Sequence, residues 1–337
     1  MTTEELIDRI ARAGKAGDWS AIQILMGELK RLMTEEGRPL AGSGALRLVE
    51  ALSESTGLGS GGGPSPYPLI NEIKRLSAIR PVDMAALRAS WDSLYSLLAN
   101  PAVNIETESI RDLLKALRAA RAFELLGRTA DRGLVRQPND PLILCAYGQG
   151  LIDSGQMHAG IAMLEQVLKL PGLPEADRIE AHGIMARAYK QIYVEHVQSP
   201  HTPPSIRERY RPYLEKAIAN YAAVYDPNKA GDAYWNGGNV IALLIMARED
   251  GQKVTNPTSL EPEEIAKRML AALNPQVDAT GDPWVIATAG EACLALKDYE
   301  QAAQRFGAFA RHKETNAFML GSTLRQLEQV WRVNPGH

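Results

Sequence analysis

Apolar and polar positions follow a helical pattern along nearly the whole chain. Apolar residues recur three and four positions apart, which places them on one face of a helix, and the alternation of a half-buried strand is absent. The pattern therefore predicts an all-α protein. Helices are predicted at residues 40–55, 67–79, 83–99, 175–197, 205–225, 232–249, 262–273, 283–296, 299–311 and 316–332.

Residues 284–310 carry small and large residues where two antiparallel helices must touch. Gly290 and Ala302 are small, so the two helix axes can approach closely, and Lys297-Asp298-Tyr299 between them makes a short polar turn. Phe306 then supplies apolar bulk one turn after Ala302. This pattern is typical of a tetratricopeptide repeat, a pair of helices of about 34 residues that stacks on copies of itself.

The same pattern recurs elsewhere in the chain. Residues 141–171 repeat it with Gly148 and Gly160 at the small positions, and weaker copies lie at about 107–138 and 3–36. Four copies favour a tetratricopeptide-like α-solenoid of antiparallel helix pairs. The alternative is an ordinary helical bundle that contains similar hairpins.

A Gly/Ser/Pro segment, GLGSGGGPSP, divides the chain. Gly57, Gly59 and Gly62 match the dinucleotide-binding pattern GxGxxG, but no strand precedes them and Pro64 follows, so a flexible linker is the better interpretation. The predicted organisation is an N-terminal helical unit at 1–56, the linker at 57–66, helical hairpins at 67–140 and a repeat domain at 141–332.

Composition narrows the classes of function. The chain has 337 residues, 45% of them hydrophobic and 23% charged, with a formal net charge of −3, which argues against a dedicated nucleic-acid binder. Two cysteines imply no disulfide framework. The N-terminus is acidic and resembles no signal peptide, and the longest apolar run, 240–247, is too short to span a bilayer. We therefore expect a cytoplasmic protein that does not bind membranes.

Several segments resemble a known family. WNGGNVIALL (235–244), DPWVIATAGEACLAL (282–296) and STLRQLEQVW (322–331) resemble the TRAF-binding region of the apoptosis signal-regulating kinases, and still more its bacterial tetratricopeptide counterparts, which ARAYKQIYV (186–194) also resembles. The resemblance covers about 141–332. Its motif residues are Gly237, Gly238, Trp284, Arg325 and Gln326.

The resemblance implies a regulatory helical-repeat module that binds partners beside an effector. In the kinases the effector is the kinase domain; in bacteria it can be a trypsin-like or caspase-like peptidase or another toxic effector, often in defence or signalling systems. This sequence has neither the glycine-rich loop of a kinase nor its catalytic HRD motif, and residues 1–135 lie outside the match. The effector is then expected to be a separate protein or a missing extension.

No motif in the sequence indicates catalysis. HExxH, CxxC and the P-loop pattern are absent, and Ser43 does not complete a GxSxG motif. Cys145 could be paired with His182 as a nucleophile, but its place in a helix-packing seam favours a buried structural thiol. We therefore predict no catalytic residue, metal or cofactor, and hence no enzyme.

Polar residues on the first helix of each predicted pair are the candidates for a partner-binding surface, because that helix lines the concave face of a tetratricopeptide stack. Asn239 could offer its amide to a partner main chain, since asparagine both donates and accepts. Close helix packing is the favoured reason for the adjacent Gly237 and Gly238. The candidates are Gln149, Asp153, Arg187, Lys190, Gln191, Trp235, Asn236, Asn239 and Glu291.

A run of basic residues on two consecutive helices is a further candidate. It includes Lys115 and Arg118, and its possible anion or acidic-partner patch consists of Arg121, Arg128, Arg132 and Arg136. A solvated helix face is the favoured alternative for this run.

The sequence thus predicts a non-enzymatic interaction and regulatory scaffold that binds a protein segment on a concave surface. One alternative is the sensor or inhibitory half of an effector system, with a protease or another effector as its partner. A second alternative is a sensor of a small anionic ligand held by the groove and the basic run. The sequence leaves self-association open.

Overall fold

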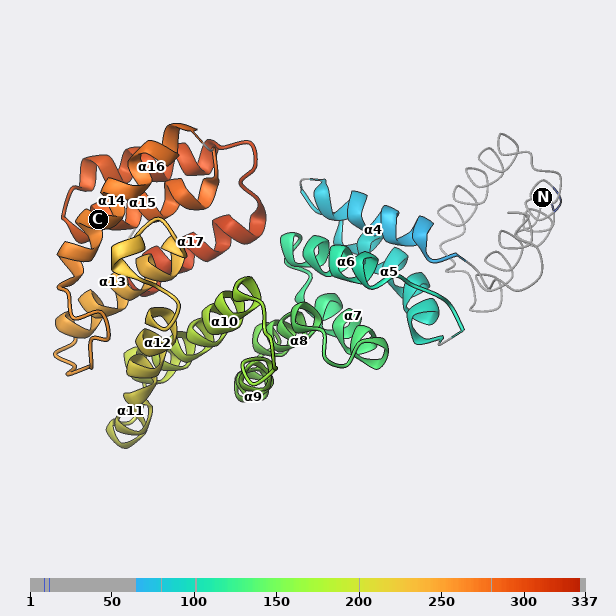
Figure 1. The fold of residues 1–337 in the computed structure, drawn as a ribbon, viewed down its shortest axis with the longest axis horizontal. Helices are drawn as coiled ribbons and strands as arrows, with labels where there is room; N and C mark the ends of the chain where they lie inside the picture. Colours follow the sequence, from blue (N-terminus) through green and yellow to red (C-terminus); the bar gives the residue numbers. More distant parts are fainter. Residues whose placement is uncertain are drawn as a thin grey trace. The chain divides into compact units, whose positions relative to one another are not determined.

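The computed structural model describes residues 65–333, except residues 80, 101, 200 and 280, together with residues 9 and 12. The predicted N-terminal unit at 1–56, apart from those two residues, and most of the predicted linker lie outside the described residues. Within the described part, regular structure is entirely helical, without strands, as predicted (Figure 1).

The helices follow one another with short connections. The first part comprises α4 (Tyr67–Ala78), α5 (Met84–Ala99), α6 (Thr107–Ala119), α7 (Phe123–Arg136), α8 (Pro141–Asp153) and α9 (Met157–Val167). The second part comprises α10 (Glu175–Tyr193), α11 (Pro204–Tyr210), α12 (Pro212–Ala222), α13 (Tyr234–Glu249), α14 (Pro262–Ala279), α15 (Pro283–Ala295), α16 (Tyr299–Arg311) and α17 (Ala317–Gln329).

The described chain divides into two compact units. The first contains residues 65–73 and 88–106, where Trp91 is fully buried and stacks on Tyr95 with ring centroids 4.7 Å apart. The second contains residues 74–87 and 107–333, so the expected boundary after residue 140 lies inside this unit.

Helices of the second unit pack in neighbouring pairs: α6 with α7, α8 with α9, α10 with α12, α13 with α14, and α15 with α16. Successive pairs also touch, since α7 packs on α8 and α13 packs on α15. One apolar cluster runs from Leu144 in α8 to Val330, just after α17. The burial of this shared cluster is the main stabilisation of the unit.

Glycines permit the closest helix contacts, as the sequence predicts. A Cβ on Gly150 would lie 2.5 Å from the Cα of Gly127, and one on Gly160 would lie 2.6 Å from the carbonyl oxygen of Gly148. Gly290 faces the ring of Phe306, 3.0 Å from where its Cβ would be. Backbone and ring thus occupy the space that a side chain would need.

The same turn ends the first helix of four pairs. In α6, α8, α13 and α15 the second residue after the helix end is left-handed: Arg121 (φ 58°), Gly155 (φ 85°), Gly251 (φ 63°) and Lys297 (φ 60°). The next N–H donates to the carbonyl five residues earlier, for example from Asp298 to Cys293 at 3.0 Å. This is the Schellman arrangement, which satisfies carbonyls that the helix leaves open.

Two predicted helices differ in extent. The helix predicted at 205–225 is divided into α11 and α12 at Pro212, which occupies the first turn of α12, where its missing N–H costs nothing. The helix predicted at 262–273 continues to Ala279 through Pro275. Proline removes a single helical hydrogen bond, and the following residues continue the helix.

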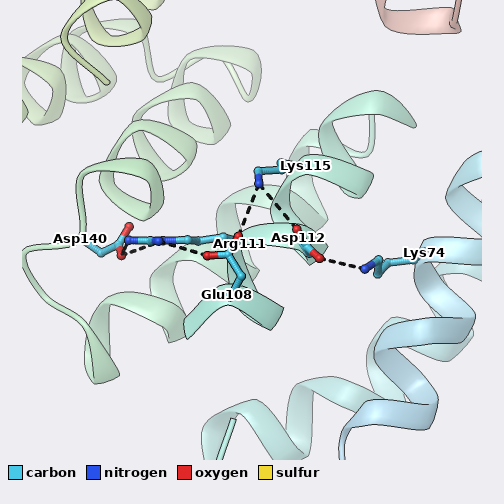
Figure 2. A network of polar contacts seen from close by, with 6 residues as sticks. All are labelled: Lys74, Glu108, Arg111, Asp112, Lys115 and Asp140. Atoms are coloured by element: carbon cyan, nitrogen blue, oxygen red, sulfur yellow. Dashed lines mark hydrogen bonds and ion pairs between the residues drawn. The ribbon is translucent and has the colours of Figure 1, made fainter. Parts of the chain in front are cut away.

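A chain of ion pairs fixes α6 to the start of α8 (Figure 2). Arg111 donates from Nε and Nη2 to Oδ2 of Asp140, at 3.0 and 2.7 Å, while Oδ1 of Asp140 accepts the N–H of Ile143 and caps α8. Lys74 donates to Asp112 at 3.0 Å, a hydrogen bond that lowers the pKa of Asp112. The network sets the position of α6, whose last turn reaches the site described next.

Candidate binding pocket

A pocket of about 440 Å³ lies in the second unit among α6, α10, α12, α13, α15 and α17. Its basic lining residues are Lys115, Arg118, Arg187, Lys190 and Arg325, and its acidic ones are Glu180 and Glu291. Its aromatic lining residues are Tyr221, Trp235, Trp284 and Phe318. The pocket therefore combines an excess of positive charge with aromatic walls, within the size range of small-molecule sites.

Helix α17 forms one wall of the pocket. Asn316 caps the helix by accepting the N–H groups of Phe318 and Met319, at 3.0 and 3.1 Å. The ring of Phe318 packs edge to face with Phe123 and Trp284, with centroids 6.3 and 6.2 Å apart. The start of α17 is therefore held between the α6–α7 pair and α15.

A polar network holds the other end of α17 against α10, α13 and α15. Lys190 donates to Oδ1 of Asn239 at 2.9 Å and to Oε1 of Gln326 at 2.5 Å. Nε2 of Gln326 in turn donates to Glu291 at 3.1 Å, and the indole N–H of Trp331 donates to the same carboxylate oxygen at 2.9 Å. Each of the four helices thus contributes a member to one connected set of hydrogen bonds.

Burial shifts both charged members of this network towards their neutral forms. Loss of water lowers the pKa of Lys190 to about 7, helped by repulsion from Arg187 and Arg325 and opposed by Glu291. Burial likewise raises the pKa of Glu291, while hydrogen bonds from Trp331 and Gln326 and the charge of Lys190 oppose the rise. The ammonium group is held by amide oxygens, and no carboxylate in the described part of the chain lies within ion-pair distance of it.

The arginines of the pocket differ in how they are neutralised. Arg187 pairs with Asp153 at 2.8 Å, and Arg118 pairs with Glu180 at 2.5 Å. Arg325 makes no hydrogen bond or ion pair with the residues that the structure describes. Its pKa is lowered by burial first and then by repulsion from Arg187 and Arg121. Arg325 is therefore a cation placed among cations.

Many of the residues predicted from the sequence meet in this pocket. Trp235 fits there because Gly183 leaves room for its ring, which would otherwise collide with a Cβ. Asp153 joins through its ion pair with Arg187. Gathered in the pocket are Arg187, Lys190, Gln191, Trp235, Asn239 and Glu291, with Trp284, Arg325 and Gln326 from the motifs.

Two predicted surface residues are instead buried. Gln149 is 1% exposed and Asn236 is 0% exposed, so the expectation that they face a partner is wrong. Both lie on helix faces that pack on neighbouring helices. Gly237 meets the ring of Tyr225 and Gly238 meets Thr288, so close packing, as favoured from the sequence, accounts for these two glycines.

The basic run of α6 and α7 does not form one surface at the pocket. Arg128 pairs with Glu124 and Arg132 lies 3.9 Å from Asp131, and neither these two nor Arg136 line the pocket. Arg121 instead lies against Gly321 of α17, where an added Cβ would be 2.4 Å from its Nη1.

Sequence reasoning missed two of the four aromatic residues that line the pocket. Phe318 belongs to none of the segments singled out in the sequence, and its place follows from the packing of α17 on α15. Tyr221 lies on the second helix of its pair, the helix that a tetratricopeptide stack turns away from its concave face. The beginning of α17 is predicted at residue 316, where Asn316 caps the helix, but no local signal indicates which helices α17 contacts.

Three further observations concern metal binding, thiol chemistry and membrane insertion. No group of three His, Cys, Asp or Glu residues in this part of the chain could hold a metal ion. The Cys145 thiol is buried, and burial raises its pKa well above the ordinary value, which disfavours the nucleophilic thiolate. Over the same residues, no helix has both the length and the hydropathy required to cross a membrane.

Comparison with known proteins gives no match among family models, curated proteins or solved structures.

Proposed function

We propose that this chain is a tetratricopeptide-like solenoid that acts as a non-enzymatic interaction and regulatory module and binds a helical segment of a partner protein. The recurrence of one Schellman turn after α6, α8, α13 and α15 supports a repeat architecture, because equal turns join the helices of successive pairs. The proposal also places the protein in the cytoplasm and includes an effector, such as a peptidase, as its partner.

One observation carries the binding mode. Lys190 and Glu291, chosen from the sequence as partner-binding residues, bond to Gln326 of α17, a helix of the same chain, and Asn239 holds Lys190 by accepting its hydrogen bond. We call the surface of α10, α13 and α15 that carries these residues the wall. The wall therefore already binds a helix, through the side-chain amide of Gln326 and the indole N–H of Trp331. Recognition of a helix laid against such a wall is a recurrent mode of protein binding.

In this mechanism a partner helix either packs beside α17 or takes its place. The wall is formed by side chains on packed helices, so little conformational entropy is lost on its side when the partner binds. Displacement of α17 frees Lys190 and Glu291 to bond with the partner. The partner then needs hydrogen-bonding groups in the places that Gln326 and Trp331 hold.

Parallel affinity captures from native lysate, followed by binding measurements with the purified partner, test the proposal. The baits are the full chain, Lys190→Met in the wall, Gln326→Ala in α17, and Arg128→Gln on α7 as the matched control. We expect Lys190→Met to weaken the partner's Kd about tenfold or more, Gln326→Ala to strengthen it if α17 competes, and Arg128→Gln to leave it unchanged. A partner that binds all four proteins equally well contradicts the proposal.

A further inference from the structure

The pocket beside α17 has features that a docked helix does not use. Basic side chains reach it from three helices: Lys115 and Arg118 from α6, Lys190 from α10 and Arg325 from α17. Glu291, by contrast, accepts two hydrogen bonds from α17 and its following residues. Lys115 is paired with Glu108 and Asp112, and Arg118 with Glu180, so Arg325 is the lining arginine that the described residues leave without an ion pair.

Arg325 is the most informative of these cations. The charges of Arg187 and Arg121 repel it, Asp153 attracts it more weakly, and none of the residues that the structure describes forms an ion pair with it. Placing a cation among cations costs folding free energy. A bound anion would turn this repulsion into attraction, which is the arrangement expected at a binding site that trades stability for function.

Unsatisfied polar groups accompany the charge. The Oγ of Ser322, on the same helix as Arg325 and in the pocket lining, is buried without a hydrogen-bond partner. Nη1 of Arg121, beside α17, is likewise buried and unpartnered. A buried hydroxyl or guanidinium nitrogen costs free energy unless it is hydrogen-bonded. Oxygen atoms of a ligand could satisfy such groups.

The remaining walls are aromatic. Trp235 packs edge to face on Tyr221, with centroids 6.3 Å apart, and Trp284 packs on Phe318. Aromatic walls bind flat rings by stacking, while several spread cations bind a multiply charged group better than a single carboxylate. The volume of about 440 Å³ is in the range of sites for small organic ligands.

We propose that this pocket binds a nucleotide-class ligand, with its phosphates towards the cations of α6, α10 and α17 and its flat base against the tryptophan walls. The inference does not depend on partner binding by the helical wall. Because Arg325, Phe318 and Ser322 belong to α17, a bound ligand ties α17 to α6 and α10. Ligand binding should therefore slow the transient separation of α17 from α6 and α10.

Isothermal titration calorimetry of the full chain tests the ligand class. ADP, GDP, CDP and UDP are titrated separately, with adenosine supplying a ring without phosphate and inorganic pyrophosphate an anion without a ring. We expect at least one nucleoside diphosphate to bind at least about tenfold more tightly than either fragment, with affinity falling as ionic strength rises. Absence of saturable binding by all four, or equal binding by a fragment, overturns the proposal.

Substitution of Arg325 tests the location. Arg325→Gln should weaken nucleotide binding about tenfold or more, yet leave the melting temperature equal or higher because repulsion is removed. Arg128→Gln, outside the pocket, should change neither. Hydrogen exchange should show slower exchange of α17 amides with nucleotide than without. The assignment is contradicted if Arg325→Gln binds nucleotide as tightly as the wild type or has a markedly lower melting temperature. It is also contradicted if nucleotide leaves the hydrogen exchange of α17 unchanged.

Discussion

The seam between two successive helix pairs and the wall beneath α17 are held together in opposite ways. At the α7–α8 seam, glycine backbones touch, and no side chain lies between Gly127 and Gly150. At the wall, Gln326 accepts a hydrogen bond from Lys190 and donates one to Glu291 between the helices. The seam brings backbone against backbone, whereas the wall keeps charged groups where water is scarce.

This difference indicates what each region does. Tight apolar seams fix the angles between helices, since added atoms have nowhere to go. A buried polar network adds little to the net stability, but the loss of one member destabilises the protein strongly. The network also determines which groups can pack against it. We infer that the seams determine the shape of the second unit and that the wall is reserved for recognition.

The largest expected effect breaks a seam. In Gly150→Ala the new Cβ would lie 2.5 Å from the Cα and 2.9 Å from the N of Gly127, which are backbone atoms that cannot rotate away. We expect a loss of about 2–4 kcal/mol in unfolding free energy, despite the better helix propensity of alanine. Denaturant unfolding followed by circular dichroism measures it.

Gly307→Ala is the matched control for the seam. Its Cβ would meet the flexible end of Arg311, at 3.2 Å from Nη2, which can move aside. We expect this variant to gain about 0.5–1 kcal/mol from helix propensity. If Gly150→Ala were as stable as Gly307→Ala, the close seam would not be a determinant of stability.

An intermediate effect tests the wall through pH. The folded chain holds the proton of Lys190 less tightly, with a pKa of about 7, than an unfolded lysine with its ordinary value near 10.5. The lysine's contribution to the unfolding free energy therefore rises as pH increases from about 7 towards 10. We expect the rise to be about 1–3 kcal/mol, since solvent still reaches part of this side chain.

The measurement compares wild type with Lys190→Met between pH 6 and 9. The difference in unfolding free energy isolates Lys190, because the buried cysteines and tyrosines, whose raised pKa values oppose the trend, occur in both proteins. We expect the stability of wild type relative to Lys190→Met to increase with pH. The exposed Lys169→Met serves as control, and equal pH dependence in all three proteins would contradict a desolvated wall lysine.

The smallest effect concerns the turns. Lys297 adopts φ 60° where the equivalent turns use Gly155 and Gly251. Lys297→Gly should therefore stabilise by about 0.5–1 kcal/mol, and Gly155→Ala should destabilise by about 1 kcal/mol with no steric contact involved. Thermal unfolding measures both, and changes of the same sign in the two variants would contradict a shared turn geometry.

The sequence predicts the helices of the second unit well because each helix has its own hydrophobic period and its own start and stop signals. Asp282 before α15 and Gly155 after α8 are local signals that act within one turn. The prediction ended at 273 for α14, because Pro275 is a local signal to stop that the packed helix overrides. Gln149 and Asn236 were misplaced because the period of a helix identifies its faces without saying which neighbour covers each face.

Residue pattern by itself determined that this chain is helical, where small residues allow helices to touch, and that Lys190, Asn239 and Glu291 belong to one surface. Only the tertiary structure decided that α17 lies on that surface and brings Arg325 beside Arg187. Hydrogen bonds and repulsions between residues more than a hundred positions apart leave no local trace. They arise from which helices meet, and side-chain packing across the whole second unit decides that.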